Sequence, residues 1–222
     1  MRKRFNEQLQ ELNKEMITMG SLIEQAIENV RVLLSSRNVE AARVIMRGDN
    51  DIDRKEREIE SMCLRMLLMQ QPVASDLRLI SAALKMITDM ERIGDQAADI
   101  AEILSMPTKG DDLPIPHHLN QMASETAAMV HKAVDAYVSR DAALARQVVE
   151  QDDVVDHLFD EVKGELLEIM STHSKIIKHE GGSQLLDMLM IAKYFERSAD
   201  HATNIAEWVE YAVTGQYKGE TL

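Results

Sequence analysis

Two segments of the chain carry nearly the same twelve-residue pattern, 105 positions apart. Residues 91–102 read ERIGDQAADIAE and residues 196–207 read ERSADHATNIAE. Residues 36–53 and 139–156 form a second pair of similar blocks, with an offset of 103. An internal repeat constrains the architecture strongly, because each copy is expected to fold as the same unit. The sequence therefore predicts one structural unit used twice, which is too few copies for a solenoid.

The spacing of apolar residues predicts helices almost throughout. Apolar side chains recur at three- and four-residue intervals, and no segment shows a sustained two-residue alternation typical of strands. We expect six long helices and no sheet. The predicted helices lie near residues 4–35, 38–70, 75–106, 117–139, 142–177 and 182–214. Helices of this length are typical of bundles, so the predicted fold class is all-α, with two tandem homologous three-helix bundles.

One segment has the composition of a linker. Three of the four prolines lie at positions 107, 114 and 116, close to Gly110. Proline and glycine interrupt helices, and this segment falls between the two copies of the repeat. We therefore predict a first three-helix repeat at residues 1–106, a linker at 107–116 and a second repeat at 117–222.

Composition excludes several classes of protein. The formal net charge is −13, which opposes binding to a phosphate backbone, so we expect no nucleic-acid partner. No apolar run approaches the roughly 18 residues that a transmembrane helix needs. The basic N-terminus leads into polar residues, so we expect that it is not a secretion signal. A single cysteine, Cys63, rules out an internal disulfide and suits a reducing compartment. We expect a cytoplasmic protein.

Acidic side chains follow one face of the repeated helical segments. Residues four apart lie one above the other on a helix, so Glu91, Asp95 and Asp99 share a face. Asp49 and Asp53 have the same spacing on the preceding segment. If these two helices form an antiparallel hairpin, the two sets of carboxylates come to the same height. The candidate metal ligands of the first repeat are therefore Glu91, Asp95, Asp99, Asp49 and Asp53.

The second repeat carries a matching set of candidate ligands. These residues are Glu196, Asp200, Asn204, Asp152 and Asp156. Carboxylates that converge repel one another and must be protonated, solvated or bridged by cations. Asn204 stands where the first repeat has a third carboxylate, so the second set has one negative charge fewer. We expect the second site to bind metal more weakly than the first.

The ligand atoms of these sets are nearly all carboxylate oxygens. Hard cations such as Mg²⁺, Mn²⁺ and Ca²⁺ prefer oxygen ligands, and bridging carboxylates also hold iron or zinc. The pattern does not choose among Mg, Mn, Fe and Zn. One metal-free alternative stays open, in which Arg92 and Arg197 neutralise a solvated acidic edge and the bundle acts as a structural scaffold.

Other metal and catalytic classes find little support. A ferritin-like carboxylate metalloenzyme needs Glu-x-x-His pairs, and none of the seven histidines has Glu three residues earlier. The zinc hydrolase string His-Glu-x-x-His, the phosphate-binding P-loop and the nucleophile elbow are all missing from the sequence. His117 and His118 show no ligand spacing. We expect that the protein is not an enzyme.

Three motifs together resemble the PhoU family. They are RGDNDID at residues 47–53, QPVASDLRL at 71–79 and ERIGD at 91–95. The resemblance extends over nearly the whole chain and implies a pair of three-helix bundles. It also implies metal binding by an acidic residue followed four positions later by Asp. This motif falls on Glu91 and Asp95, Asp49 and Asp53, Glu196 and Asp200, and Asp152 and Asp156.

The same resemblance implies a function and partners. Members of this family regulate phosphate uptake and repress the phosphate-starvation response. The expected partners are components of the phosphate ABC transporter and a sensor histidine kinase, at the cytoplasmic face of the membrane. Family members often dimerise, and long helices leave apolar surface that a partner would cover. We therefore expect a homodimer or a higher homo-oligomer.

Overall fold

The computed structural model describes residues 2–69, 72–107, 113–173, 182–218 and 220–221. Within them lie six long helices close to the predicted ranges. Their bounds are α1 (Arg2–Ser36), α2 (Val39–Met69), α3 (Ala74–Ser105), α4 (His117–Ser139), α5 (Ala142–Thr172) and α7 (Gly182–Thr214). The fold is all-α, as predicted. The predicted ends of the second and fifth helices, at residues 70 and 174–177, lie outside the described residues.

A short extended pairing follows the last helix. β1 (Gln216–Tyr217) pairs antiparallel with β2 (Glu220–Thr221), outside the helical bundle. Tyr217 stacks on Trp208 of α7 with 4.2 Å between ring centroids, and Lys218 Nζ lies 3.0 Å from Glu207 Oε2. These contacts hold the segment against α7. Two-residue strands are too short for alternation to reveal them in a sequence.

The repeated block at residues 36–38 and 139–141 forms the corner between the first two helices of each half. Arg37 and Arg140 both have left-handed backbones, with φ of 46° and 54°. The next residue caps the following helix. The Asn38 side chain accepts two backbone N–H groups of α2, and Asp141 accepts two of α5 at 2.8 and 3.1 Å. Such caps stabilise a helix by about 1 kcal/mol, which explains why both corners use Asn or Asp.

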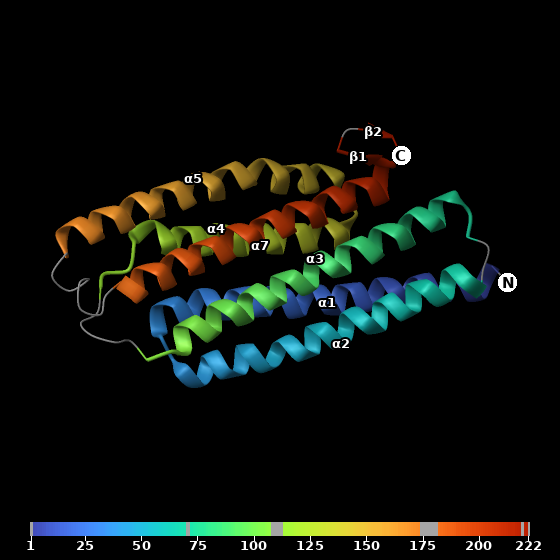
Figure 1. Ribbon diagram of the computed structural model, residues 1–222. Coiled ribbons are helices and arrows are strands. Elements are labelled where there is room, and N and C mark those ends of the chain that lie inside the picture. The colour runs from blue at the N-terminus through green and yellow to red at the C-terminus, as the bar shows by residue number, and fades with distance from the viewer. Residues whose placement is uncertain (1, 70–71, 108–112, 174–181, 219, 222) are drawn as a thin grey trace.

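The two halves lie side by side with their long axes nearly aligned (Figure 1). In the first half α2 and α3 form an antiparallel hairpin, and α5 and α7 do the same in the second. α3 packs along α7, and α1 contacts α4, so the halves meet over most of their length. α3 and α7 run in opposite directions (Figure 1). The end of α2 with the start of α3, and the end of α5 with the start of α7, therefore lie at opposite ends of the molecule.

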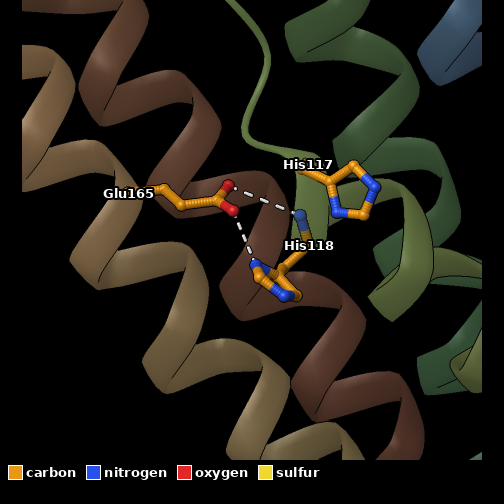
Figure 2. Close-up of side chains that lie close together, drawn as sticks. All are labelled: His117, His118 and Glu165. Carbon is orange, nitrogen blue, oxygen red and sulfur yellow. Dashed lines mark hydrogen bonds and ion pairs between the residues drawn. The ribbon is translucent and has the colours of Figure 1, made fainter.

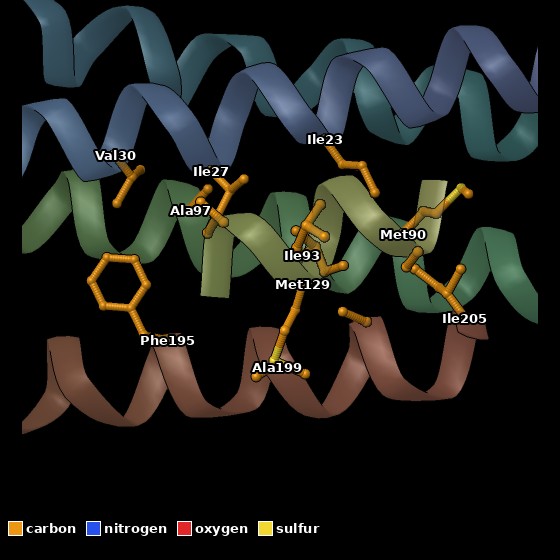
Figure 3. Close-up of a cluster of buried hydrophobic side chains, with 14 of the residues drawn as sticks. Ile23, Ile27, Val30, Met90, Ile93, Ala97, Met129, Phe195, Ala199 and Ile205 are labelled. Atoms are coloured by element: carbon orange, nitrogen blue, oxygen red, sulfur yellow. The ribbon is translucent and has the colours of Figure 1, made fainter. Parts of the chain in front are cut away.

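The halves share one hydrophobic core. Figure 3 shows Ile23 and Ile27 of α1 close to Ile93 of α3, with Met129 of α4 and Phe195 of α7 pointing into the same cluster. All five side chains are fully buried. Buried apolar residues from both halves belong to one continuous cluster, so the bundle is two repeats fused along their inner faces.

Candidate metal centre

Three carboxylates of the first repeat converge between α2 and α3. Asp49 and Asp53 lie one turn apart on α2, and Asp95 faces them from α3. One ligand oxygen from each residue lies within 4.8 Å of the others. The three side chains are half-buried. The antiparallel hairpin thus brings together the carboxylates that the sequence placed at the same height.

Asp49 has the most unusual environment in this cluster. Its Oδ1 atom is buried and has no hydrogen-bond partner among the described residues. Burial raises the pKa of Asp49 to about 6, and the carboxylates of Asp95 and Asp53 add to the effect. A buried polar atom without a partner is costly. A cation bound between the three carboxylates would satisfy this oxygen.

Glu91 and Asp99 extend the cluster along α3 in opposite directions. Burial raises the pKa of Glu91, with a further contribution from Asp95. The Asp99 carboxylate contributes to the raised pKa of Asp49 and also approaches the second half of the molecule. Burial raises the pKa of Tyr194 on α7, and the Asp99 carboxylate raises it further. Asp99 therefore lies between the acidic cluster and the interface of the two repeats.

Gly94 allows α2 and α3 to approach closely at the cluster. A Cβ atom added at Gly94 would lie 2.8 Å from Ile52 Cδ1 and 3.1 Å from Asp49 Oδ1. The equivalent residues of the second repeat are Ala199 and Val155, both fully buried. The first repeat thus pairs the larger Ile52 with glycine, and the second repeat pairs the smaller Val155 with Ala199. The methyl group that is missing from Val155 is present on Ala199. Reasoning from the carboxylates alone gave Gly94 no role.

Two arginines partly neutralise the first cluster. Arg92 Nη1 lies 2.7 Å from Asp95 Oδ2, and Arg57 Nη1 lies 3.5 Å from Asp53 Oδ2. Both arginine side chains are more than half exposed, so these ion pairs are screened by solvent and individually weak. Neither contact reaches Asp49 Oδ1. The arginines therefore leave room for a cation on the inner side of the cluster.

The second acidic set is more open. Burial raises the pKa of Asp152 to about 6, helped by Asp200 and Asp156. Asp156 and Asp200 are exposed, whereas their counterparts in the first repeat are half-buried. In the described residues, no three carboxylates of this set lie as close together as those of the first cluster.

Two substitutions reduce the negative charge of the second set. Lys193 forms an ion pair with Glu196, at the position where the first repeat has Thr88. Asn204 Nδ2 donates to Asp89 Oδ1 of α3 at 3.0 Å, and His201 Nδ1 lies 2.8 Å from the same oxygen. Asn204 thus joins the two halves across α3 and α7. These contacts lower the net negative charge of the second set; weaker metal binding there stays a prediction.

The donor set of the first cluster fits a hard cation. Metal–oxygen distances are about 2.0–2.1 Å for Mg²⁺ and 2.3–2.6 Å for Ca²⁺, so ligands on opposite sides of the ion lie roughly 4–5 Å apart. The observed separations, all within 4.8 Å, fall in this range. Asp49, Asp53 and Asp95 would hold the ion, with Glu91 and Asp99 as neighbours. A bound cation would tie α2 to α3 and remove the repulsion among the carboxylates.

A second group of possible ligand side chains lies at the start of α4. Figure 2 shows Glu165 of α5 directed at His118, with His117 beside it. Glu165 Oε1 lies 2.6 Å from the His118 Nδ1 atom, and Oε2 accepts the His118 backbone N–H at 3.4 Å. The residue that precedes α4 is Pro116, whose side chain provides no cap. Glu165 therefore acts as an N-terminal cap supplied by a neighbouring helix, a role that sequence spacing does not reveal.

Glu165→Ala should lower the free energy of unfolding by about 1 kcal/mol, because α4 loses the acceptor at its N-terminus. Urea unfolding followed by circular dichroism measures the change. Glu161→Ala is the matched control, since Glu161 lies one turn earlier on α5 and is exposed. Equal stability of the two variants would show that the Glu165 contacts do not stabilise the helix.

The metal-free protein should become more stable as pH falls from about 7 to about 5. Asp49 and Asp152 have folded pKa values of about 6, above their ordinary value of 3.8, so the folded state binds their protons more tightly. Their contribution to stability is present below pH 3.8 and is lost as pH rises through 6. Thermal unfolding in chelator at several pH values measures the trend. The double substitution Asp49→Asn and Asp152→Asn should flatten it, and an unchanged slope would contradict the assignment.

The fold and the acidic centre define a class of protein. It is an all-α bundle of two repeats, with a carboxylate cluster between the second and third helices of the repeat. The model of the PhoU domain matches this chain twice, at residues 16–104 and 119–209. The chain belongs to the PhoU family.

Relatives of known name agree with this assignment. The chain is 37% identical to the phosphate-specific transport system accessory protein PhoU homolog of Clostridium acetobutylicum, over 97% of this chain and 96% of that protein. It is 32% identical to the homolog of the same name from Pseudomonas aeruginosa, over 96% of this chain and 86% of that protein.

Solved structures show the same fold. The crystal structure of PhoU from Pseudomonas aeruginosa superposes with a TM-score of 0.88 at 32% identity, covering 96% of this chain and all of that chain. The phosphate transport system regulatory protein PhoU from Streptococcus pneumoniae gives a TM-score of 0.85 at 26% identity, covering 96% and 98%. No helix in the described part of the chain has the length and apolar character that crossing a bilayer requires.

Proposed function

We propose that this protein is a cytoplasmic regulator of phosphate uptake and of the phosphate-starvation response, and that it acts by contact with other proteins. The observation that carries the proposal is the family match over both repeats, together with relatives named as accessory proteins of the phosphate-specific transport system. The proposed partners are components of the phosphate ABC transporter and a sensor histidine kinase. In this role the protein holds the starvation response down when phosphate is ample, and it catalyses no reaction.

The surface of the bundle supports action through protein contacts. Apolar side chains are exposed at both hairpin ends, which we call the apolar tips. The first tip, at the turn between α2 and α3, includes Leu68 and Met69, which are 85% and 68% exposed. The second, where α5 ends and α7 begins, includes Leu167 and Leu186, 66% and 64% exposed. Exposed apolar groups of this size favour association with a partner. A second copy of the chain would also cover such surface, so we propose a homodimer or higher oligomer.

Metal binding completes the proposal. A divalent or trivalent cation at Asp49, Asp53 and Asp95 would hold α2 against α3 and so fix the shape of the first hairpin, whose turn carries an apolar tip. A metal-free scaffold is the second candidate, because Arg92 and Arg57 already pair with two of these carboxylates. Elemental analysis of the protein purified without chelator separates the two candidates, since only the first predicts bound metal in a fixed ratio to protein.

A reporter of the phosphate-starvation response tests the regulatory role. Deleting the gene in its native organism should raise reporter expression in phosphate-rich medium, and the wild-type gene should restore repression. The double substitution Leu68→Asp and Met69→Asp places charges on the first apolar tip and should fail to restore it. Val44→Asp is the control, because Val44 is also exposed on α2 but lies far from the tip. Unchanged expression after deletion would remove the regulatory proposal.

A further inference from the structure

A cavity of about 700 Å³ lies between the two halves, away from both acidic centres. The start of α3, the end of α7, the first turns of α1 and the corner after α4 surround it. Leu79, Met86 and Val209 contribute to apolar walls. This volume is within the range of about 300–1,000 Å³ that is typical of sites for small molecules. None of the carboxylates proposed as metal ligands lines it.

The charge of this cavity is opposite to that of the whole chain. Arg78 and Arg140 both line it, and among its described lining residues there is no Asp or Glu. The chain as a whole has a formal net charge of −13. Tyr137, whose pKa is raised by burial, and Ser75 add hydroxyl groups to the lining. We call this space the dibasic cavity.

The fold holds Arg78 in place at the wall. The guanidinium packs against the backbone of Gly215, just after α7, where any side chain would collide with it. Gly215 has φ of 83°, a conformation that glycine adopts without strain. Arg78 Nε is buried and has no hydrogen-bond partner among the described residues. A guanidinium nitrogen without an acceptor leaves the positive charge of Arg78 poorly compensated within the protein, which favours an anion in the adjoining cavity.

The repeat provides an internal comparison. A second cavity, of about 370 Å³, occupies the equivalent place at the other end of the molecule. Arg37 lines it at the position equivalent to Arg140, but Ser183 stands where the dibasic cavity has Arg78. Asp187 also lines this second cavity and supplies a negative charge. Among the described residues, the two cavities use equivalent positions on the third helix of each half but differ in their charged side chains, so the pair of arginines is not a requirement of the fold.

We propose that the dibasic cavity binds a small organic anion, a molecule with an apolar body and a phosphate or carboxylate group. Guanidinium groups bind both kinds of oxyanion through paired hydrogen bonds, and Arg78 and Arg140 would hold the charged group. The apolar walls would contact the rest of the molecule. The second cavity, whose described lining has one arginine and one aspartate, is expected not to bind such a ligand. This inference does not depend on metal binding or on the proposed regulatory role.

Two fluorescent probes that differ in charge test the proposal. The first is 8-anilinonaphthalene-1-sulfonate, an aromatic anion, and the second is N-phenyl-1-naphthylamine, which has the same rings without the charge. Titration of the full chain in chelator should show one tight site per chain for the anion, from which phenyl phosphate displaces it. Using chelator separates the result from any metal at the acidic centre. Failure of the wild-type protein to bind the anionic probe overturns the proposal.

Matched variants locate the site. Arg78→Gln should weaken binding of the anionic probe by about tenfold or more, because a charged hydrogen bond is lost. It should leave the neutral probe unaffected. Arg140→Asn should act in the same direction, and Asn suits the left-handed backbone there. Arg37→Asn makes the same change in the second cavity and should have no effect. Val213→Trp, at a half-exposed lining position, should weaken binding of both probes by filling the cavity.

The outcomes of these titrations are distinct. Unchanged affinity for the anionic probe in both Arg78→Gln and Arg140→Asn overturns the proposal. An equal loss in Arg37→Asn overturns it too, since the effect would then follow net charge and not the cavity. If Arg78→Gln does not fold, as judged by circular dichroism, Arg140→Asn and Val213→Trp decide the question.

Discussion

Asp95→Asn combined with Glu91→Gln should remove most of the metal that the wild-type protein binds. The two substitutions take two charges from the first cluster and replace an oxygen that faces Asp49. A ligand present at 100 times its dissociation constant stabilises the folded state by about 2.7 kcal/mol, so added Mn²⁺ should raise the wild-type thermal midpoint by several degrees. The double variant should show little or no rise. Elemental analysis after gel filtration and thermal unfolding with Mn²⁺ or chelator measure the two effects.

The second repeat provides the comparison for this experiment. Asp200→Asn with Glu196→Gln makes the same chemical change in the more open set and should remove less metal. Asp51→Asn with Glu60→Gln is the control for net charge, since both residues are exposed on α2. In chelator the first-repeat variant should be at least as stable as the wild type, because repulsion is relieved. Equal metal content in all four proteins would place the ions elsewhere.

Gly94→Ala should destabilise the protein by about 1–2 kcal/mol, although alanine favours helices. Overpacking a tight core site lowers the free energy of unfolding by about 1–3 kcal/mol, whereas replacing glycine by alanine in a helix raises it by about 0.5–1 kcal/mol. The added methyl group would meet Ile52 and the Asp49 carboxylate. Because the second repeat pairs alanine with valine at these places, Ile52→Val should relieve most of the cost. Urea unfolding of the wild type, both single variants and the double variant measures the coupling.

The outcome of this cycle is a coupling free energy between positions 52 and 94. Ile→Val alone usually costs about 0.5–1.5 kcal/mol, so additive effects would make the double variant the least stable of the four proteins. We expect instead that it is more stable than Gly94→Ala. Additivity within about 0.5 kcal/mol would show that the two side chains do not compete for the same space. Metal content of the same variants reports whether the spacing of α2 and α3 also sets the shape of the cluster.

The architecture was predictable because it depends on features that sequence displays directly. Apolar periodicity gave six helices whose ends agree with the structure within a few residues wherever the structure describes them, and the repeat gave two similar halves. The position of Asp49 along the helix axis, level with Asp95, followed from the geometry of an antiparallel hairpin. Each of these inferences needs only local spacing and one assumption about how adjacent helices pair. The exact boundaries of the two repeats and the ligand roles of the carboxylates stay predictions.

The details that distinguish the two sites depend on packing between distant segments. The role of Gly94 becomes visible only when Ile52 is seen to occupy the space above it. Lys193 offered a signal, since it replaces Thr88 beside the acidic motif, but its ion pair with Glu196 required side-chain geometry. Asn204 fitted the acidic pattern by position, yet its amide contacts Asp89 of the other half. Contacts between helices that are far apart in the sequence produce no periodic pattern in the amino-acid sequence of either helix.

The opposite directions of α3 and α7 have a consequence for assembly. Because the two hairpins point away from each other, their apolar tips lie at the two ends of the bundle (Figure 1). The helices that carry the tips have 31–33 residues and rise about 1.5 Å per residue, so each is roughly 45–50 Å long. A protein bound at one tip leaves the other free of steric conflict. If the proposed partners bind at these tips, one chain would hold two different proteins at opposite ends of the bundle.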